Sequence, residues 1–264
     1  IFMFSSCKNV PSTNYHWIKN SLDVASFQLK MTADEIADSA KVPRSIWKDA
    51  DVDFLTRQLG RGKETFQDSL RIISPAKLGH RRLTDVYDWT SGFFPGSLWY
   101  AYELTGSEVL KKDASKFTNL LNPVKEYTGT HDLGFMMFCS YGNAERLAHN
   151  DTIPQVLVQT ANNLISRFDD KIGCIRSWDF GPWNFPVIID NMMNLDLLFY
   201  ASKCTGDNKY MDVAIKHANT TMKHHFRPDF TSYHVISYNN DGSVQCKQTH
   251  QGLADSTAWA RGQA

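Results

Sequence analysis

Two stretches of the chain about a hundred residues apart repeat one pattern of apolar and polar residues. "LWYAYELTGSEVLKKDASKFTN" aligns with "LLFYASKCTGDNKYMDVAIKHANT", and Thr105-Gly106 falls on Thr205-Gly206. Each stretch reads as two amphipathic helices separated by a glycine, which commonly ends a helix. A third pair, "DLGFMMFCSYGNAERLAH" and "TIPQVLVQTANNLISRF", lies between them with Asn150-Asp151 at the turn. The unit is a helical hairpin of about fifty residues, and repeated hairpins predict a solenoid or a closed ring.

Irregular, aromatic-rich stretches separate the helical pairs. They include "DVYDWTSGFF", "EYTGTHD" and "IRSWDFGPWNF". A fourth such stretch, "YHVISYNNDGSVQCKQTHQG", predicts a β-hairpin with its turn at Asn240-Asp241-Gly242. In a ring of hairpins such stretches gather at one end, so their polar and aromatic residues converge on a central cleft.

The composition excludes several classes of function. Lys plus Arg equals Asp plus Glu at 28 each, so no net basic field attracts nucleic acid. No apolar run approaches the roughly 18 residues of a membrane span. The chain has no H-E-x-x-H, G-x-G-x-x-G, Walker A or G-x-S-x-G motif. We therefore expect a globular protein that needs no metal and no organic cofactor.

Asp190 is the most informative ionisable residue. It lies in "VIIDNMMN", among apolar residues of a predicted helix, with Asn191 and Asn194 close by. Burial disfavours an ionised carboxylate, and a carboxyl group that keeps its proton near neutral pH suits a general acid. The alternative is a buried aspartate that caps a neighbouring helix.

Asp132 is the second candidate carboxylate and follows His131 in the loop "YTGTHD". It equally suits the N-cap of a helix beginning at "LGFMMFCS". Two carboxylates in one cleft are the usual equipment of glycoside chemistry.

Aromatic and basic residues complete the candidate site. The faces of tryptophan side chains cover the C–H patches of sugars, and Trp89, Trp178, Trp183 and Trp259 are candidates, although core packing explains any single one equally well. Arg261 can bind a carboxylate through its guanidinium fork. Its alternative role is that of an exposed helix residue.

The N-terminal segment predicts export. "FSSC" ends an apolar stretch with small residues and Cys7, as at the cleavage site of a bacterial lipoprotein signal. Cys7 would then carry a lipid and tether a periplasmic or cell-surface protein. The alternative is a frayed apolar terminus with an ordinary cysteine. We accordingly expect residues 1–20 to be a signal remnant and linker, and residues 21–264 to form the N-terminal part of one catalytic domain.

The motifs "DWTSGFFPGSLW", "HDLGF", "IIDNMMN" and "HQGLADSTAWARGQA", in this order, resemble those of the unsaturated glucuronyl hydrolases, glycoside hydrolase family 88. The matching region runs from about residue 85 to the end. The resemblance implies an all-α fold, an (α/α)6 barrel of which about four of six hairpins lie in this chain. Ser91 departs from the family pattern, which commonly has an acidic residue after "WT".

The resemblance also implies an activity: removal of a 4,5-unsaturated uronic acid from the non-reducing end of a lyase-generated oligosaccharide. Asp190 would act as general acid and base, with Asp132 as its partner. Trp89, His250, Gln251, Trp259 and Arg261 would line the sugar site. From their place in the polar, aromatic stretches we expect Trp178, His131 and Asn191 to contact the sugar as well. An unsaturated rhamnogalacturonyl hydrolase and a tethered, non-catalytic glycan-binding protein are the alternatives.

Overall fold

The computed structural model describes residues 15–46, 80–250 and 255–256 of the chain. Its helices are α1 (His16–Glu35), α4 (Phe93–Thr105), α5 (Glu108–Leu120), η2 (Asn122–Glu126), η3 (Gly134–Gly142), α6 (Asn143–Ala148), α7 (Ile153–Ile165), η4 (Ile189–Leu195), α8 (Asp196–Thr205) and α9 (Lys209–His225). Its strands are β1 (Val42–Ile46), β2 (Arg81–Thr84), β3 (Phe168–Asp169), β4 (Cys174–Ile175), β5 (Pro186–Ile188), β6 (Val235–Tyr238) and β7 (Val244–Gln248).

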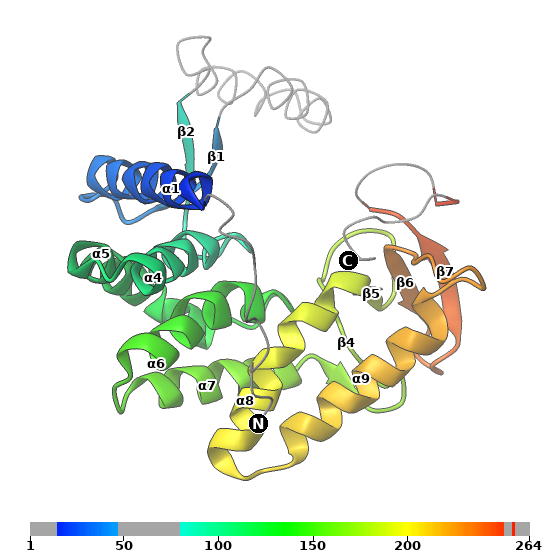
Figure 1. Ribbon diagram of the computed structural model, residues 1–264. Coiled ribbons are helices and arrows are strands. Elements are labelled where there is room, and N and C mark those ends of the chain that lie inside the picture. Colours follow the sequence, from blue (N-terminus) through cyan, green and yellow to red (C-terminus); the bar gives the residue numbers. More distant parts are fainter. Residues whose placement is uncertain (1–14, 47–79, 251–254, 257–264) are drawn as a thin grey trace, which may run out of the picture.

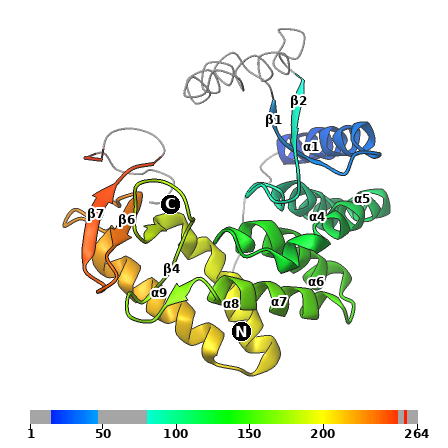
Figure 2. The same cartoon turned by 180° about the vertical axis from the view of Figure 1, so that it is seen from behind.

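The helices form the three predicted hairpins. α4 pairs with α5, the continuous η3–α6 segment pairs with α7, and α8 pairs with α9. Together with α1 they follow one another along an arc (Figure 1), which the view from behind shows equally (Figure 2). This arrangement confirms the predicted fold class, a helical-hairpin architecture of the (α/α)6 type.

Glycine ends the first helix of two hairpins, as the aligned Thr-Gly pairs predicted. Gly106 follows α4 with φ at 70°, and Gly206 follows α8 with φ at 74°. Glycine adopts this left-handed conformation without steric cost, and the backbone N–H of each then donates to a carbonyl of the last helical turn. The same local chemistry therefore turns the chain in both hairpins.

A continuous apolar core fills the space between the helices. Leu98 of α4, Phe117 of α5, Leu157 of α7 and Leu198 of α8 all belong to it and are almost fully buried. The indole N–H of Trp99 donates to the Thr118 hydroxyl at 2.9 Å, so the one polar atom of this large buried side chain has a partner. The hairpins thus share one core, which fixes the loops at their ends.

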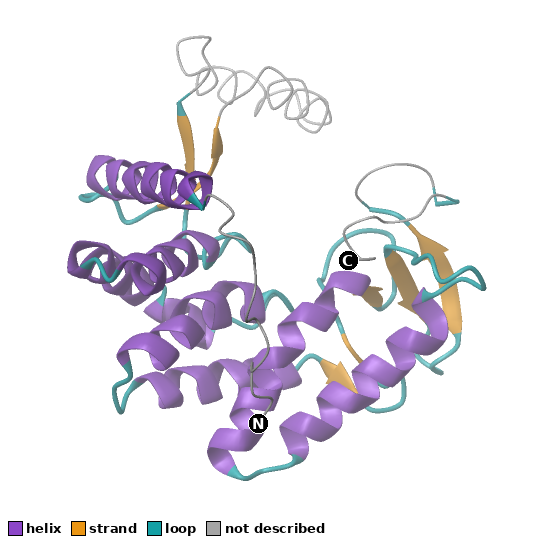
Figure 3. Ribbon diagram, viewed as in Figure 1, coloured by secondary structure: helices purple, strands orange, loops and turns teal. Residues whose placement is uncertain are grey.

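A three-stranded sheet accompanies α9 (Figure 3). β6 and β7 form the predicted β-hairpin, with Gly242 at φ 85° in the turn. The third strand, β5, pairs antiparallel with β6 and was not predicted, because its sequence was read as the start of a helix. Proline opens β5, and an apolar β-branched run follows, a composition that favours a buried strand.

Two helices differ in kind from the predicted α-helices. η3 is a π-helix of 9 residues, and η4 is a 3₁₀-helix of 7 residues that begins directly after β5. π-Helical turns are rare and occur frequently at functional sites. Both unusual segments immediately follow or contain a candidate carboxylate, Asp132 or Asp190.

The predictions for the N-terminal segment concern residues that are not described. Cys7 and its neighbours lie outside the described residues, and so does most of the proposed signal remnant and linker, residues 1–20. Within the described part of the chain, no helix is long and apolar enough to cross a membrane. Cys139, Cys174, Cys204 and Cys246 are free thiols.

Candidate active site

A cavity of about 630 Å³ opens among the loops at one end of the hairpins. Its lining combines three carboxylates with several aromatic rings. The residues are Tyr87, Asp88, Trp89, Phe93, Tyr127, Gly129, Thr130, Asp132, Phe135, Trp178, Phe180, Ile188, Asp190, Met193 and His250. The cavity therefore brings together Asp132, Asp190, Trp89, Trp178 and His250, all of which the sequence had singled out.

Asp132 is held in place by its own loop. The Thr130 hydroxyl donates to Asp132 Oδ2 at 2.8 Å and also accepts the Asp132 backbone N–H at 3.2 Å. The Asp132 side chain is 17% exposed. It does not cap the following helix, because Leu133 occupies the N-cap position and no side chain forms a capping bond there. The carboxylate is thus left to face the cavity.

Asp190 lies in the first turn of η4, just after β5. Its side chain is partly buried, and it lines the same cavity as Met193. Residues three apart share one side of a 3₁₀-helix, so Asp190 and Met193 face the cavity while Asn191 and Asn194 face the core. The 3₁₀ geometry, in place of the predicted α-helix, decides which of these polar side chains reaches the cavity.

Asn194 ties the two carboxylate-bearing segments together. Its side-chain Oδ1 accepts the backbone N–H of Phe135 at 2.9 Å, and this contact is buried. Gly134 allows the close approach: a Cβ at this position would lie 2.5 Å from the Asn194 Cα. η3 and η4 therefore meet backbone to backbone, directly beside Asp132 and Asp190.

Gly92 brings the "WTSGF" loop against the same helix. A Cβ at Gly92 would lie 2.2 Å from the carbonyl oxygens of both Phe135 and Met136, so only glycine fits. This packing places Trp89 in the cavity wall. Its ring lies edge to face with the rings of Phe93 and Phe135, at centroid distances of 5.7 Å and 6.1 Å. Ser91 is fully buried and is not among the residues that line the cavity.

A second aromatic wall comes from the segment between β4 and β5. The rings of Trp178 and Phe180 stack with a centroid distance of 4.9 Å and an interplanar angle of 17°. The His250 ring lies 5.0 Å from the Trp178 ring, centroid to centroid. Phe180 is 56% exposed, although it is a large apolar residue. Trp183 packs behind this wall, and its indole N–H donates to Gln248 at 2.6 Å. The stacked pair offers an apolar surface of the kind that sugar rings cover.

Asp88 is a third carboxylate at the cavity and was not among the predicted site residues. Burial alone would raise its pKa, but hydrogen bonds from Thr90 and Arg44 outweigh that effect and hold the pKa of Asp88 below its ordinary value. Arg44 Nε lies 2.8 Å from Asp88 Oδ2. Asp88 is therefore a fixed anion, satisfied by its neighbours, and a poor proton donor.

Two predicted sugar contacts lie behind the cavity wall instead. Asn191 is fully buried, and its amide lies 3.2 Å from His217 Nε2. His131 is also fully buried, with Nε2 3.3 Å from Asp132 Oδ1 and its backbone N–H donating to Ser177 O at 3.1 Å. Contrary to expectation, neither residue lines the cavity; His131 contacts Asp132, which does, whereas Asn191 contacts the buried His217.

The remaining predictions concern the end of the chain. Gln251, Trp259 and Arg261 lie outside the described residues. The backbone N–H of His250 donates to His234 Nδ1 at 3.1 Å, and burial lowers the pKa of the His250 imidazole. Over residues 15–46, 80–250 and 255–256, no group of three or more His, Cys, Asp or Glu side chains is arranged to hold a metal ion.

Helical hairpins along an arc, with carboxylates in an aromatic cavity at their ends, are typical of carbohydrate-active proteins of the (α/α)6 type. Comparisons with known proteins agree. An unsaturated glucuronyl hydrolase from Formosa agariphila is 51% identical over 181 residues, 67% of this chain and 45% of that protein. An unsaturated chondroitin disaccharide hydrolase from Streptococcus pyogenes serotype M1 is 34% identical over 190 residues, 69% of this chain and 47% of that protein.

A solved structure gives the same result. The crystal structure of an unsaturated glucuronyl hydrolase specific for heparin superposes with a TM-score of 0.79 at 43% identity, covering 94% of this chain and 59% of that chain. The chain belongs to the family of the unsaturated glucuronyl hydrolases, glycoside hydrolase family 88. It spans about half the length of the curated relatives it matches. A family model described as a domain of unknown function also matches residues 1–61 and crosses the predicted boundary at residue 20.

Proposed function

We propose that the protein removes a 4,5-unsaturated uronic acid from the non-reducing end of an oligosaccharide by adding water to the sugar's double bond. The single observation that carries this proposal is the pair of aspartates, Asp132 and Asp190, in one cavity with aromatic walls. A protein that only binds a glycan has no need of two carboxylates beside an aromatic surface that contacts the sugar. A hydrolase needs a proton donor there.

The chemistry requires one carboxyl group that gives and then takes a proton. The double bond of the unsaturated uronide is an enol ether, and its C4 atom is electron-rich. Protonated Asp190 donates its proton to C4, which leaves an oxocarbenium-like positive charge at C5. Asp190, now a carboxylate, takes a proton from water as the water oxygen bonds to C5.

The product of this addition decomposes by itself. The hemiketal at C5 opens by breaking the bond between C5 and the ring oxygen. C1 is then a hemiacetal, and its collapse releases the hydroxyl group of the next sugar. Water is the only co-reactant. Asp132 faces the same cavity and would act as the partner that orients Asp190 and the water.

The walls of the cavity would bind the sugar rings. Trp89 and the stacked Trp178–Phe180 pair present ring faces or edges at the cavity. Asp88 stays ionised through Arg44 and Thr90.

Activity is measured by the loss of ultraviolet absorbance of the conjugated uronate double bond. The assay uses this chain and any longer polypeptide that contains it, with unsaturated disaccharides from chondroitin, hyaluronan and heparin. The relatives' names, chondroitin disaccharide hydrolase and heparin-specific glucuronyl hydrolase, support a glycosaminoglycan source. Preference for a rhamnose-linked unsaturated galacturonide would instead assign the rhamnogalacturonyl activity. Binding without turnover would assign a glycan-binding protein.

We also propose that the protein is exported and anchored by a lipid on Cys7, because small residues and Cys7 end an apolar stretch. Cells grown with an alkyne-labelled fatty acid should label the wild-type protein in its membrane fraction. The Cys7→Ala variant should carry no label. Equal labelling of both would contradict the anchor.

A further inference from the structure

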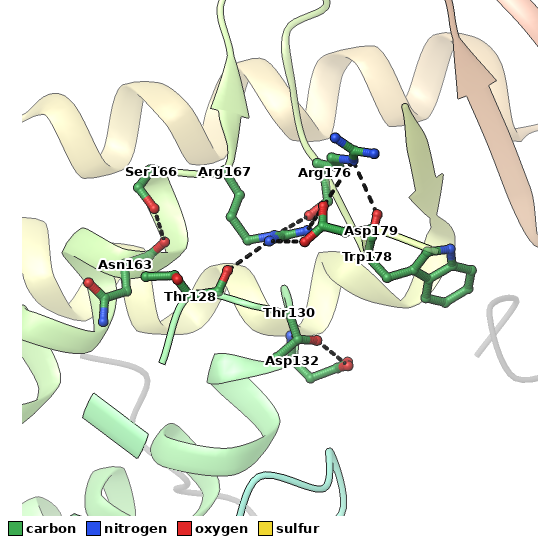
Figure 4. A network of polar contacts seen from close by, with 9 residues as sticks. All are labelled: Thr128, Thr130, Asp132, Asn163, Ser166, Arg167, Arg176, Trp178 and Asp179. Carbon is green, nitrogen blue, oxygen red and sulfur yellow. Dashed lines mark hydrogen bonds and ion pairs between the residues drawn. The ribbon is translucent and has the colours of Figure 1, made fainter. Parts of the chain in front are cut away.

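A buried arginine outside the cavity connects its two walls. Arg167 follows α7, and its side chain is 8% exposed. One terminal nitrogen donates to Thr128 O at 2.7 Å and to Asp179 Oδ2 at 3.0 Å, and the other donates to Asp179 Oδ1 at 3.0 Å. The Nε atom donates to Arg176 O at 2.9 Å. Figure 4 shows the guanidinium group between these acceptors. We call Arg167, Thr128 and Asp179 the clamp.

Each end of the clamp belongs to a loop that forms one wall. Thr128 lies two residues before Thr130, which holds the Asp132 carboxylate. Asp179 lies between Trp178 and Phe180, the stacked pair of the aromatic wall. The clamp therefore connects the loop that carries Asp132 to the loop that carries the stacked aromatic pair.

Two further contacts stabilise the same pair of loops. The backbone N–H of His131 donates to Ser177 O at 3.1 Å, which joins the same two loops directly. Arg176 Nε donates to Trp178 O at 3.1 Å and lies 3.2 Å from Asp179 Oδ1. Asp179 thus accepts hydrogen bonds from Arg167 and forms an ion pair with Arg176, and hydrogen bonding to Arg167 holds the pKa of Asp179 below its ordinary value.

The fork geometry distinguishes the clamp from an ordinary surface ion pair. Exposed pairs contribute little, whereas a bidentate, mostly buried guanidinium fixes both the distance and the angle of its partners. Arg167 does not line the cavity, so it cannot touch a substrate there. Its effect on a bound sugar passes through Thr128 and Asp179.

We propose that Arg167 is a positioning residue that sets the spacing between the Asp132 wall and the Trp178–Phe180 wall. This inference rests on the proposed function, because the spacing matters only if a sugar bound against the aromatic wall must meet the acid–base group. A displacement of about 1 Å at such a site can reduce the rate by about 100-fold.

The test compares substitutions that remove the fork with one that removes a matched fork elsewhere. Arg167→Lys keeps the positive charge but cannot bridge Thr128 and Asp179 together. We expect kcat to fall about 10- to 100-fold with KM changed much less. Asp179→Asn should lower kcat as well. Because both substitutions remove the same contact, the kcat of the double variant should be no lower than that of the less active single variant. Arg146→Lys, which breaks a fork to Glu103 between α6 and α4, should leave kcat unchanged.

Hydrogen exchange gives a readout that does not depend on turnover. In Arg167→Lys, the amides of residues 127–133 and of residues 176–181 should exchange faster together, because both loops lose one anchor. Arg146→Lys should leave both segments unchanged. Unchanged kcat in the clamp variants, or faster exchange confined to one loop, overturns the proposal.

The two failures are distinguishable. If the wild-type protein turns over no unsaturated disaccharide, the proposed function fails, and hydrogen exchange still decides whether Arg167 couples the loops. If the wild-type protein is active and the clamp variants match it, only the positioning role fails. Should Arg167→Lys not fold, Asp179→Asn decides alone, since Asp179 is 53% exposed and asparagine keeps one side-chain oxygen that can accept a hydrogen bond from Arg167.

Discussion

Replacing Asn194 by Ala tests whether the two carboxylate-bearing segments depend on one buried hydrogen bond. Asn194 Oδ1 accepts the Phe135 backbone N–H at 2.9 Å, and both residues are buried. Alanine leaves this N–H without an acceptor in a dry environment. A buried donor that loses its partner costs about 1–3 kcal/mol. For a chain of this size that corresponds to a fall in Tm of roughly 2–12 °C.

The same substitution should reduce activity more than its stability cost implies. η4 carries Asp190, and η3 follows Asp132, so the lost bond loosens the spacing of the two carboxylates. We expect kcat to fall about tenfold or more at a temperature where the variant is still folded, because small displacements of reacting groups are costly. KM should change little, since the aromatic walls remain.

Thr118→Val is the matched control. It removes the hydroxyl that accepts the buried Trp99 indole N–H at 2.9 Å; neither residue lines the cavity, so the variant should lose stability without losing kcat. The assay is thermal unfolding together with steady-state kinetics on one unsaturated disaccharide. If Asn194→Ala is destabilised as expected but keeps the wild-type kcat, then the η3–η4 contact does not set the geometry of the site.

Two further predictions concern buried titratable groups. Burial lowers the pKa of both His217 and His225 to about 3, and His217 Nδ1 accepts the Ile175 N–H, so each stays neutral in the folded state. The unfolded chain takes up these protons below its ordinary pKa of about 6.5, so stability in urea should fall as pH drops from 6.5 toward 3, by up to about 1.4 kcal/mol per pH unit for each histidine. A His217→Gln variant with an equally steep pH dependence would contradict this. Burial also raises the pKa of the Cys174 thiol to about 12, whereas Cys204 is exposed, so a thiol reagent at pH 8 should label Cys204 at once and Cys174 only on unfolding; equal labelling rates would refute the buried environment.

The hairpin architecture could be predicted because its signals are local. The Thr-Gly pairs at 105–106 and 205–206 mark the same helix ending, and the Asn240-Asp241-Gly242 turn lies between two strands, as expected. Each signal involves residues within a few positions of one another. Apolar periodicity and turn chemistry are sufficient to read such features.

The strand β5 and the 3₁₀-helix η4 could not be predicted from the same kind of signal. The run "VIIDNMMNL" suits a buried strand and a buried helix equally well, and strand pairing with β6 decides between them. This error had a consequence in the site. The 3₁₀-helix puts Asp190 and Met193 on the cavity side and turns Asn191 and Asn194 toward the core, whereas an α-helix would carry Asn194 round to the side of Asp190.

The contacts that position the site join residues distant in sequence. Arg44 contacts Asp88, Phe135 contacts Asn194, and Arg167 contacts Thr128. None of these contacts produces a repeating pattern of residues from which it could be predicted. Aspartates and tryptophans could be singled out by type, because their chemistry is unusual in an apolar context. Arg44, Thr128 and Arg167 could not, because arginine and threonine are common on any surface, and Asn194 was noted beside Asp190 without its contact to Phe135.

The central claim is that Asp190 gives a proton to the substrate, and Asp190→Asn tests it most directly. The measurement is the rate of absorbance loss from an unsaturated disaccharide, compared with the wild-type protein and with a Met193→Leu variant that changes the neighbouring cavity residue without removing a proton donor. An amide cannot donate and recover the proton, so the rate should fall at least about 10²–10⁴-fold while the disaccharide still binds. An Asp190→Asn variant that turns over at the wild-type rate would contradict the account.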